Sequence, residues 1–387
     1  MRFNAEYVKL KSVCEIKYGK DHKNLSDGNI PAYGTGGLMR YVDKSIHNKK
    51  SVLIPRKGTL SNLFLVDPPF WTVDTLFWTN IHTDIINPDF LYYQLCTMEL
   101  ASRNVGTAVP SLTTALLNEL DIMLPSMDIQ NKIVSVLSVL DRRIANNNEI
   151  NDNLAEQIRT LCNSWLSDYE PFGGTCPDDW EHTPLSSFAK FISGYSYKGS
   201  ELQESTTAMA TIKNFDRNGG FKLDGYKEIM PSSKLKSEHH VELFDTLVAH
   251  TDLTQNAEVI GNAEPVLSFS GYGDIIFSMD VVKVIPDNPA ISKFLIAAML
   301  QTRQFKEHCL GYVNGTTVLH LSKKALPEYA LMLPKDLSIL VPLDEAVSSM
   351  YRQMALNIDE NVQLANLRDS LLPQLMSGKL DVSGLDL

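Results

Sequence analysis

The stretch at residues 133–161 reads IVSVLSVLDRRIANNNEINDNLAEQIRTL, with apolar or amide side chains at alternating spacings of four and three residues. This heptad spacing is typical of a coiled-coil helix, whose first and fourth residues face a partner helix. Residues 343–371, LDEAVSSMYRQMALNIDENVQLANLRDSL, repeat the spacing 210 residues later. The two stretches therefore predict two long helices that pair along a common seam. The seam positions are Ile133, Leu137, Leu140, Ile144, Asn147, Asn151, Leu154, Ile158 and Leu161, and then Leu343, Val347, Met350, Met354, Asn357, Asn361, Leu364, Arg368 and Leu371.

Four asparagines occupy the middle of the predicted seam: Asn147 and Asn151 in the first helix, Asn357 and Asn361 in the second. An amide at a core position fixes helix register, because it needs another amide as its partner. Both an antiparallel and a parallel pair would match the four amides. We favour the antiparallel pair, because a module of about 160 residues connects the two helices. The alternative is that each helix packs separately against its own domain as an ordinary amphipathic helix.

A second repeat precedes each helix, which indicates a duplicated module. The segment GTAVPSLTTALLNELDIMLP at residues 106–125 recurs as GTTVLHLSKKALPEYALMLP at residues 315–334, at a constant offset of 209. The ends of the two sequence copies are similar and the segments between them diverge. We therefore expect two domains of one fold that recognise different targets. Further upstream matches pair Leu10, Val13 and Gly19 with Leu185, Phe188 and Gly194, and SVLIPRKGT at 51–59 loosely with DTLVAHTDL at 245–253.

These repeats predict the domain organisation of an α+β chain. Pro342 suits the first turn of the second helix, and Pro373 is expected to end it, because proline lacks the N–H that a helix interior needs. The expected parts are a first domain at 1–125, a first helix at 126–170, a second domain at 171–334, a second helix at 335–373 and a tail at 374–387.

Composition is that of an ordinary globular protein, with 387 residues, 44% hydrophobic and 21% charged, so each domain can bury its own core. The five cysteines form no C-x-x-C pair, which argues against a zinc ribbon or a disulfide framework and favours a reducing compartment. The N-terminus lacks an apolar signal segment, and no apolar run approaches the roughly 18 residues of a membrane span. We therefore expect a cytoplasmic protein.

Charge is distributed unevenly along the chain. The net charge of −11 argues against a polyanion as partner, but residues 1–66 carry 12 basic and only five acidic side chains. Such a local excess can serve as an electrostatic footprint for phosphate groups. It can equally be a solvated surface, which is what most charge clusters are.

Taken together, these features resemble the DNA-specificity (S) subunit of type I restriction-modification systems. The similarity covers essentially the whole chain, but the second helix has Leu340 where glutamine is expected. PRKGTLS at 55–61 has only a loose counterpart in the second half. The motifs that carry the resemblance are the G-T-x-V-x-x-L blocks at Gly106 and Gly315, the Leu-Pro entries at Pro125 and Pro334, Gln130, NNNE at 146–149 and LRDSLLPQLMSGKL at 367–380.

The resemblance implies two target-recognition domains of mixed helix and strand, separated by an antiparallel two-helix coiled coil. Each domain reads one half of an asymmetric, bipartite DNA target in the major groove. The four-heptad seam is about 42 Å long, which corresponds to about twelve base pairs and suits a spacer. The chain itself is then non-catalytic and holds no cofactor or metal. Two methylation subunits supply S-adenosylmethionine chemistry, and two restriction or motor subunits use ATP and magnesium.

Candidate DNA contacts are glycine-rich turns with basic, aromatic or hydroxyl side chains. Glycines let the backbone approach phosphate, and Arg40 could address guanine through two hydrogen bonds. Simple turn chemistry is the alternative interpretation. The candidates are Lys20, Tyr33, Gly34, Thr35, Gly36, Gly37, Arg40, Arg56, Lys57, Gly58 and Thr59 in the first domain, and Ser196, Tyr197, Lys198, Lys213, Asn214, Arg217, His250 and Thr251 in the second.

Two other function classes remain open. DPPF at residues 67–70 matches the active-site motif of adenine methyltransferases, and FSGYG at 269–273 resembles their S-adenosylmethionine loop. They lie in different copies of the repeat, which disfavours a self-contained N6-adenine DNA methyltransferase. The phosphate-loop signature of ATP motors is absent from the sequence. The second of these classes is a coiled-coil scaffold whose domains bind proteins.

Overall fold

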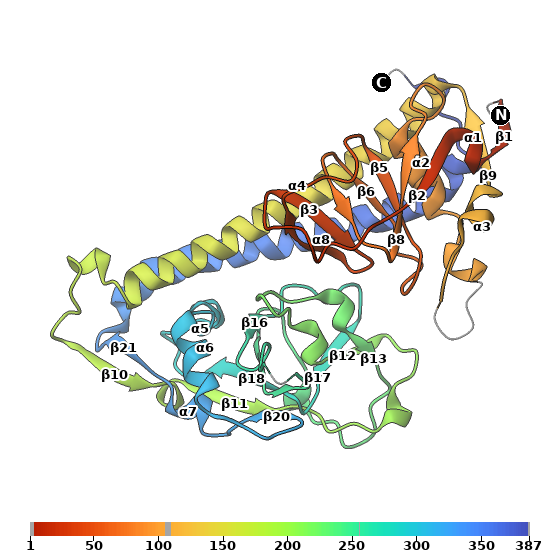
Figure 1. Cartoon of the computed structure of the whole chain (residues 1–387). Helices are drawn as coiled ribbons and strands as arrows, with labels where there is room; N and C mark the ends of the chain where they lie inside the picture. Colours follow the sequence, from red (N-terminus) through yellow and green to blue (C-terminus); the bar gives the residue numbers. More distant parts are fainter. Residues whose placement is uncertain (1–3, 105–109, 255, 386–387) are drawn as a thin grey trace. The chain divides into compact units, whose positions relative to one another are not determined.

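The computed structural model of the chain describes residues 4–104, 110–254 and 256–385. These residues form helices and strands that gather in two compact units (Figure 1). The first unit comprises Met1–Arg143 with Leu364–Leu387, and the second comprises Ile144–Gln363. No helix within the described ranges is long and apolar enough to cross a membrane.

The first unit is built around an antiparallel sheet with the strand order β2-β8-β5-β6. A smaller sheet has the order β4-β3-β7, and β1 pairs with β9. The strands are β1 (Ala5–Lys9), β2 (Cys14–Tyr18), β3 (Ile30–Gly34), β4 (Gly37–Val42), β5 (Ser51–Pro55), β6 (Phe64–Val66), β7 (Trp71–Thr72), β8 (Leu76–Ile81) and β9 (Asp121–Pro125). The short helices are α1 (Leu10–Val13), α2 (Pro88–Cys96), α3 (Thr114–Asn118) and the 3-10 turn Leu100–Arg103.

The second unit repeats this plan with the strand orders β11-β18-β14-β16, β13-β12-β17 and β10-β21, and adds β15-β20-β19. Its strands are β10 (Trp180–Pro184), β11 (Ala189–Ser193), β12 (Thr207–Ala210), β13 (Lys227–Glu228), β14 (Thr246–Ala249), β15 (Thr251–Asp252), β16 (Ala263–Pro265), β17 (Asp274–Phe277), β18 (Val281–Pro286), β19 (Val313–Asn314), β20 (Leu319–Leu321) and β21 (Ala330–Pro334). Its short helices are α5 (Lys293–Leu300), α6 (Arg303–Leu310) and α7 (Ala325–Glu328). Its 3-10 turns are Glu170–Phe172, Leu185–Ser187, Gly199–Glu201, Ile212–Asn214, Leu223–Gly225, Ser237–His239 and Leu337–Leu340.

The duplicated fold predicted from the sequence is confirmed by equivalent backbone contacts. The amide of Leu10 donates to the carbonyl of Leu120 at 2.9 Å, and the matching amide of Leu185 donates to Tyr329 at 2.7 Å. A Cβ at Gly19 or at Gly194 would lie only 2.0 or 2.1 Å from a carbonyl oxygen of the facing chain. Both positions therefore require glycine. The start of the first repeated block, Gly106 to Val109, lies outside the described residues.

Two long helices, α4 (Met127–Leu166) and α8 (Val341–Met376), run through both units. In the second unit, Asn147 pairs with Asn361 at 2.9 Å and Asn151 with Asn357 at 2.8 Å. In the first unit, Arg368 binds the carboxylate of Asp141 at 2.8 Å. Residue numbers rise along one helix as they fall along the other, so the pair is antiparallel (Figure 1).

The seam predicted from the heptad spacing is also confirmed. Every one of its positions in both helices is buried or half-buried. Three of the four amides are buried, and Asn147 has a further partner in the carboxylate of Glu360 at 2.7 Å. The chain is therefore an α+β protein with two similar mixed units and one antiparallel pair of long helices.

The prediction that Pro373 ends the second helix is wrong. Pro373 lies inside α8, which continues to Met376. The end is set by Gly378, whose positive φ of 65° is followed by a bond from the Lys379 amide to the Gln374 carbonyl at 2.9 Å. This arrangement is a Schellman motif, which satisfies the last carbonyls of a helix. A proline so close to the helix end removes only one backbone bond, and the capping motif prevails.

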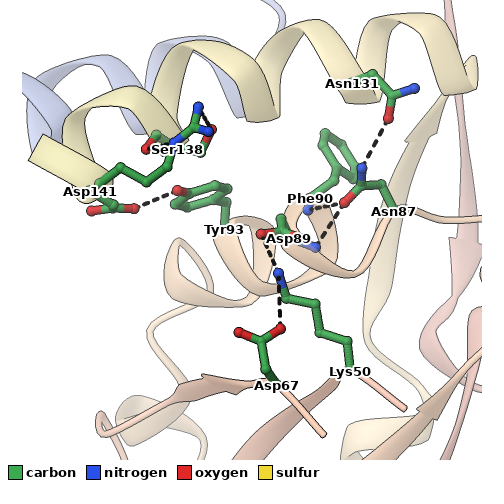
Figure 2. A network of polar contacts seen from close by, with 10 residues as sticks. Lys50, Asp67, Asn87, Asp89, Phe90, Tyr93, Asn131, Ser138 and Asp141 are labelled. Carbon is green, nitrogen blue, oxygen red and sulfur yellow. Dashed lines mark hydrogen bonds and ion pairs between the residues drawn. The ribbon is translucent and has the colours of Figure 1, made fainter. Parts of the chain in front are cut away.

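Polar contacts fix helix α2 of the first unit to α4 (Figure 2). The side-chain nitrogen of Asn87 donates to the side-chain oxygen of Asn131 at 2.9 Å, and the Tyr93 hydroxyl donates to the Asp141 carboxylate. Gln130 adds two bonds, accepting from the Asn87 backbone at 2.8 Å and donating to the Pro125 carbonyl at 2.9 Å. In the second half, the buried Leu340 stands where a glutamine is expected from the resemblance.

We predict that replacing Asn151 by leucine destabilises the chain. The change leaves the buried side-chain nitrogen of Asn357 without its acceptor, which costs about 1–3 kcal/mol. Urea-induced unfolding followed by circular dichroism measures this loss. The double replacement N151L/N357L should recover stability, because it removes both amides together. A single variant as stable as the parent chain contradicts the stabilising role of the amide pair.

Glu264 is a carboxyl group buried within the second unit. It lies on β16, where its oxygens accept from the Gly220 amide and from the Gln301 side chain, both at 2.6 Å. Burial raises the pKa of Glu264 from 4.5 to about 7, although the two hydrogen bonds and the nearby Arg159 oppose the shift. The folded state therefore holds the Glu264 proton over a pH range in which the unfolded chain has released it.

We predict that the free energy of unfolding falls as the pH rises from about 4.5 to 7, because only the folded state keeps the Glu264 proton in that window. The contribution of this residue amounts to about 3 kcal/mol at most, at 1.36 kcal/mol per pKa unit. Urea unfolding at a series of pH values measures the slope. The variant E264Q does not ionise, so its slope should be shallower than that of the parent chain; equal slopes contradict the assignment.

Candidate nucleic-acid interface

Four connecting segments of the first unit meet at one edge of its main sheet: those after β2 and β5, and the turns β3–β4 and β7–β8. Lys20, just after β2, donates its amide to the Thr72 carbonyl at 2.9 Å. Arg56, just after β5, donates its amide to the Thr75 carbonyl at 2.8 Å, so the two loops bind the end of β7 and the turn that follows it. A Cβ at Gly58 would lie 3.7 Å from the hydroxyl of Thr35, in the turn between β3 and β4. The structure therefore brings together the two glycine-containing segments singled out in the sequence, 33–37 and 56–59.

Arg56 is a constrained cation at this edge. Its guanidinium lies over the ring of Tyr18, 5.4 Å from the ring centroid, and one nitrogen donates to the Asp74 carbonyl at 3.0 Å. Stacking on an aromatic ring and one fixed hydrogen bond hold the guanidinium in place. A guanidinium has five N–H groups, so this arrangement leaves donors for a ligand.

Exposed lysines lie on the loops at this edge. Lys20, Lys23 and Lys57 are exposed, and in the described part of the chain none of them has a carboxylate within ion-pair distance. Other basic residues of the 1–66 segment are neutralised by carboxylates, namely Lys9, Lys11, Lys17, Arg40 and Lys50. Part of the local charge excess thus lies at the sheet edge, where Asp21 and Asp74 also lie, and Lys44 and Lys49 are further exposed lysines of this segment.

The hairpin of β3 and β4 exposes apolar side chains that the sequence analysis did not single out. Leu38, Met39 and Tyr41 are about half exposed, and so is Tyr18 on β2. Met39 also lines a hollow of about 540 Å³ between the hairpin turn and the turn between β7 and β8. Apolar groups at such a surface can contact the methyl group of thymine. The signal was the pair Leu-Met directly after a glycine-rich turn, where a solvated hairpin normally carries polar residues.

Arg40 has a structural role in the described contacts. Its guanidinium donates to the carbonyls of His22 at 2.9 Å and Leu25 at 2.6 Å, and it lies 3.3 Å from the Asp27 carboxylate. These contacts hold the loop that follows Lys20. Its contact with guanine stays a prediction, and so does the contact of Thr59, which is exposed on the neighbouring loop.

The second unit has the same edge with other side chains. Tyr195 donates its amide to the Phe277 carbonyl at 2.7 Å, and His250 donates to the Asp280 carbonyl at 2.9 Å. Thr251 is buried and its hydroxyl donates to the Asp280 carboxylate at 3.2 Å. Of the three candidate residues after Tyr195, Ser196 and Lys198 are exposed and Tyr197 is half-buried.

The remaining candidates of the second unit lie on the loop after β12. Lys213 is exposed, and Arg217 pairs with the Glu258 carboxylate at 3.1 Å. Asn214 is fully buried; its oxygen accepts from the Thr211 amide at 2.8 Å and its nitrogen donates to the Lys222 carbonyl at 2.7 Å. Asn214 therefore stabilises the loop, and a DNA contact from it would require the loop to open.

The two methyltransferase-like strings lie in different units. In the first, the Asp67 carboxylate is 83% exposed and lies 3.8 Å from the Lys50 ammonium group, which also binds Asp89 at 2.9 Å (Figure 2). In the second, residues 269–273 form a turn before β17, and Gly271 has a positive φ of 86°. The structure thus gives each string local contacts within its own unit.

Comparison with known proteins identifies relatives of this architecture. Residues 4–156 match the family described as the type I restriction modification DNA specificity domain. The MjaIX specificity subunit of a type I restriction enzyme from Methanocaldococcus jannaschii is 22% identical over 88% of this chain and 80% of its own length. The HindI specificity subunit from Haemophilus influenzae is 22% identical over 95% of this chain and 91% of its own length.

A solved structure shares the fold along the whole chain. The S subunit of a type I restriction-modification system from M. genitalium superposes with a TM-score of 0.57 at 18% identity, covering 96% of each chain. The fold agreement, the family match in the first half and the end-to-end similarity to specificity subunits point the same way. The first part of the chain thus matches the type I restriction modification DNA specificity domain, and most of the chain is similar to type I specificity subunits.

Proposed function

We propose that this chain is the non-catalytic DNA-reading subunit of a type I restriction-modification complex. Each unit reads one half of a bipartite target, and the paired helices set the distance between the halves. The observation that carries the proposal is a sheet edge present twice with the same backbone contacts and different side chains. Unlike side chains recognise unlike base edges, so the target is asymmetric.

The paired helices support a spacer of fixed length. Four heptads correspond to about 42 Å, or about twelve base pairs, which is close to the separation of one helical turn at which two readers address the same face of a duplex. The amide pairs fix the register of the helices. A fixed register gives a fixed length.

The chemistry of the complex is assigned to other subunits in this proposal. Two methylation subunits bind S-adenosylmethionine and extrude the target adenine from the duplex, and two restriction or motor subunits use ATP and magnesium. This chain needs no cofactor or metal of its own. The net charge of −11 suits such a division, because partner subunits can supply much of the phosphate contact. The proposed site of action is the cytoplasm, where these subunits and the chromosome meet.

Genomic methylation mapping tests the proposal. We expect cells that contain the methylation subunits to lose one bipartite methylated-adenine motif when this chain is removed, and to regain it when the chain is returned. An unchanged methylation pattern contradicts the proposal. Calorimetry on the isolated chain separates the rival function, because a self-contained methyltransferase binds S-adenosylmethionine alone and the proposed subunit does not.

Lengthening both helices should lengthen the spacer. We predict that inserting one heptad after Arg143 in α4 and one after Gln363 in α8 adds about three base pairs between the half-sites, since seven residues rise about 10.5 Å. These two sites lie at the same level of the seam, between the Asp141–Arg368 and the Asn147–Asn361 pairs. The same methylation mapping reads out the spacer. An insertion in α4 alone misaligns the seam and is the control. An unchanged spacer in the double insertion contradicts the proposal that the paired helices set the spacer length.

A further inference from the structure

Arg56 and His250 occupy the same backbone position in the two units. The amide of Arg56 donates to Thr75 at 2.8 Å, and its carbonyl accepts from the Leu112 amide at 3.0 Å. His250 makes the same two bonds, donating to Asp280 at 2.9 Å and accepting from Leu321 at 2.9 Å. Each residue directly follows the equivalent strand, β5 or β14.

Neighbouring pairings confirm that the two positions are equivalent. Lys57 forms a bridge with Ser111, and Thr251 pairs with His320 in the same antiparallel sense. The turn that accepts the two amides is closed in the same way in both units: Leu76 donates to Val73, and Val281 donates to Ser278, both at 3.0 Å. The fold therefore holds residues 56 and 250 at the same place on the sheet edge.

The side-chain surroundings of the two positions differ. Arg56 stacks on Tyr18, which pairs across the sheet with Phe77. At the equivalent place in the second unit, Ser193 pairs with Val282, so an aromatic platform is missing there. The Arg56 side chain is a preorganised cation with donors only, which matches the two acceptors of guanine in the major groove.

His250 is half-buried and has three titratable neighbours. His320 on β20 and Lys323 in the following loop are basic, and Asp280 in the turn between β17 and β18 is acidic. Burial, His320 and Lys323 lower the pKa of His250, and Asp280 opposes them. A neutral imidazole offers one donor and one acceptor, unlike the donor-only guanidinium at the equivalent position.

We infer that Arg56 and His250 are paired specificity-determining residues, each reading a base in one half of the bipartite target. This inference rests on the proposed function. Because the fold gives both residues the same backbone position, the difference between the half-sites at this point follows from the side chain alone. Arg56 selects guanine in its half-site, and His250 recognises a different base edge in the other.

The test substitutes glutamine at both positions and maps methylated motifs in cells that contain the complex. R56Q should make one half-site degenerate at one or two positions and leave the other half unchanged. H250Q should make the other half-site degenerate at one or two positions and leave the half read by Arg56 unchanged. On short duplexes in vitro, the preference of the variant complex for the original base should fall about tenfold or more at the affected position.

Matched controls carry the same substitutions outside the edge. R303Q alters an exposed arginine on α6, and H182Q alters an exposed histidine on β10. Neither control should change the motif. Melting temperatures of all four full-length variants show whether folding is retained.

The possible outcomes separate this inference from the proposed function. If the parent complex methylates no bipartite motif, the proposed function fails. If the parent does so, and either R56Q or H250Q leaves the motif intact or both alter the same half, the inference is overturned. For a variant that melts early, the exchange R56H or H250R repeats the test with a side chain that the fold already holds at the equivalent position. The R56H complex should then prefer a base other than guanine at that position of the half-site. An unchanged preference for guanine overturns the inference.

Discussion

Pairing of amides in the helix seam is the constraint on which the long-range structure depends. A slip of α8 by one heptad would place Asn147 opposite Met354 or Arg368 instead of Asn361, and its amide would lose its partner. Each buried amide left unpaired costs about 1–3 kcal/mol, while the apolar contacts of a seam change little on such a slip. Register is therefore decided by a few polar groups, whereas the burial of apolar residues such as Ile133, Leu137 and Val347 supplies most of the stability.

The two units share the backbone structure of the sheet edge and differ in the side chains that the edge carries. The backbone hydrogen bonds of Arg56 and the equivalent bonds of His250 have the same lengths within about 0.1 Å. The side chains at the two edges nevertheless differ in charge, size and hydrogen-bonding groups. Such bonds depend little on side-chain identity, because each non-proline residue carries the same donor and acceptor. A surface built in this way can change what it recognises without a change of fold.

Much of this architecture could be predicted from the sequence, because heptads, amides and the repeated blocks are regular in sequence alone. The antiparallel pairing followed from the central asparagines together with the long connection. The end of α8 could not be placed, since the capping motif at Gly378 outweighed Pro373. Individual contacts of the site could not be predicted: the hydrogen bonds by which Arg40 and Asn214 hold their loops depend on tertiary structure, and their DNA contacts stay predictions. Tyr18 became visible as a platform for Arg56 only once the strands were placed.

The charges at the sheet edge indicate how much this chain and the proposed partner subunits each contribute to the affinity and the specificity of DNA binding. The three unpaired lysines at the sheet edge can neutralise about three phosphates, which corresponds to a salt slope of about −2.7, whereas a protein that binds DNA strongly makes about six to ten such contacts. The acidic remainder of the chain opposes further phosphate binding. In the proposed function, the chain alone contributes little to affinity and mainly to discrimination, since Arg56 and His250 read bases without adding much charge. Affinity must then come largely from the partner subunits, which makes DNA reading a property of the assembled complex.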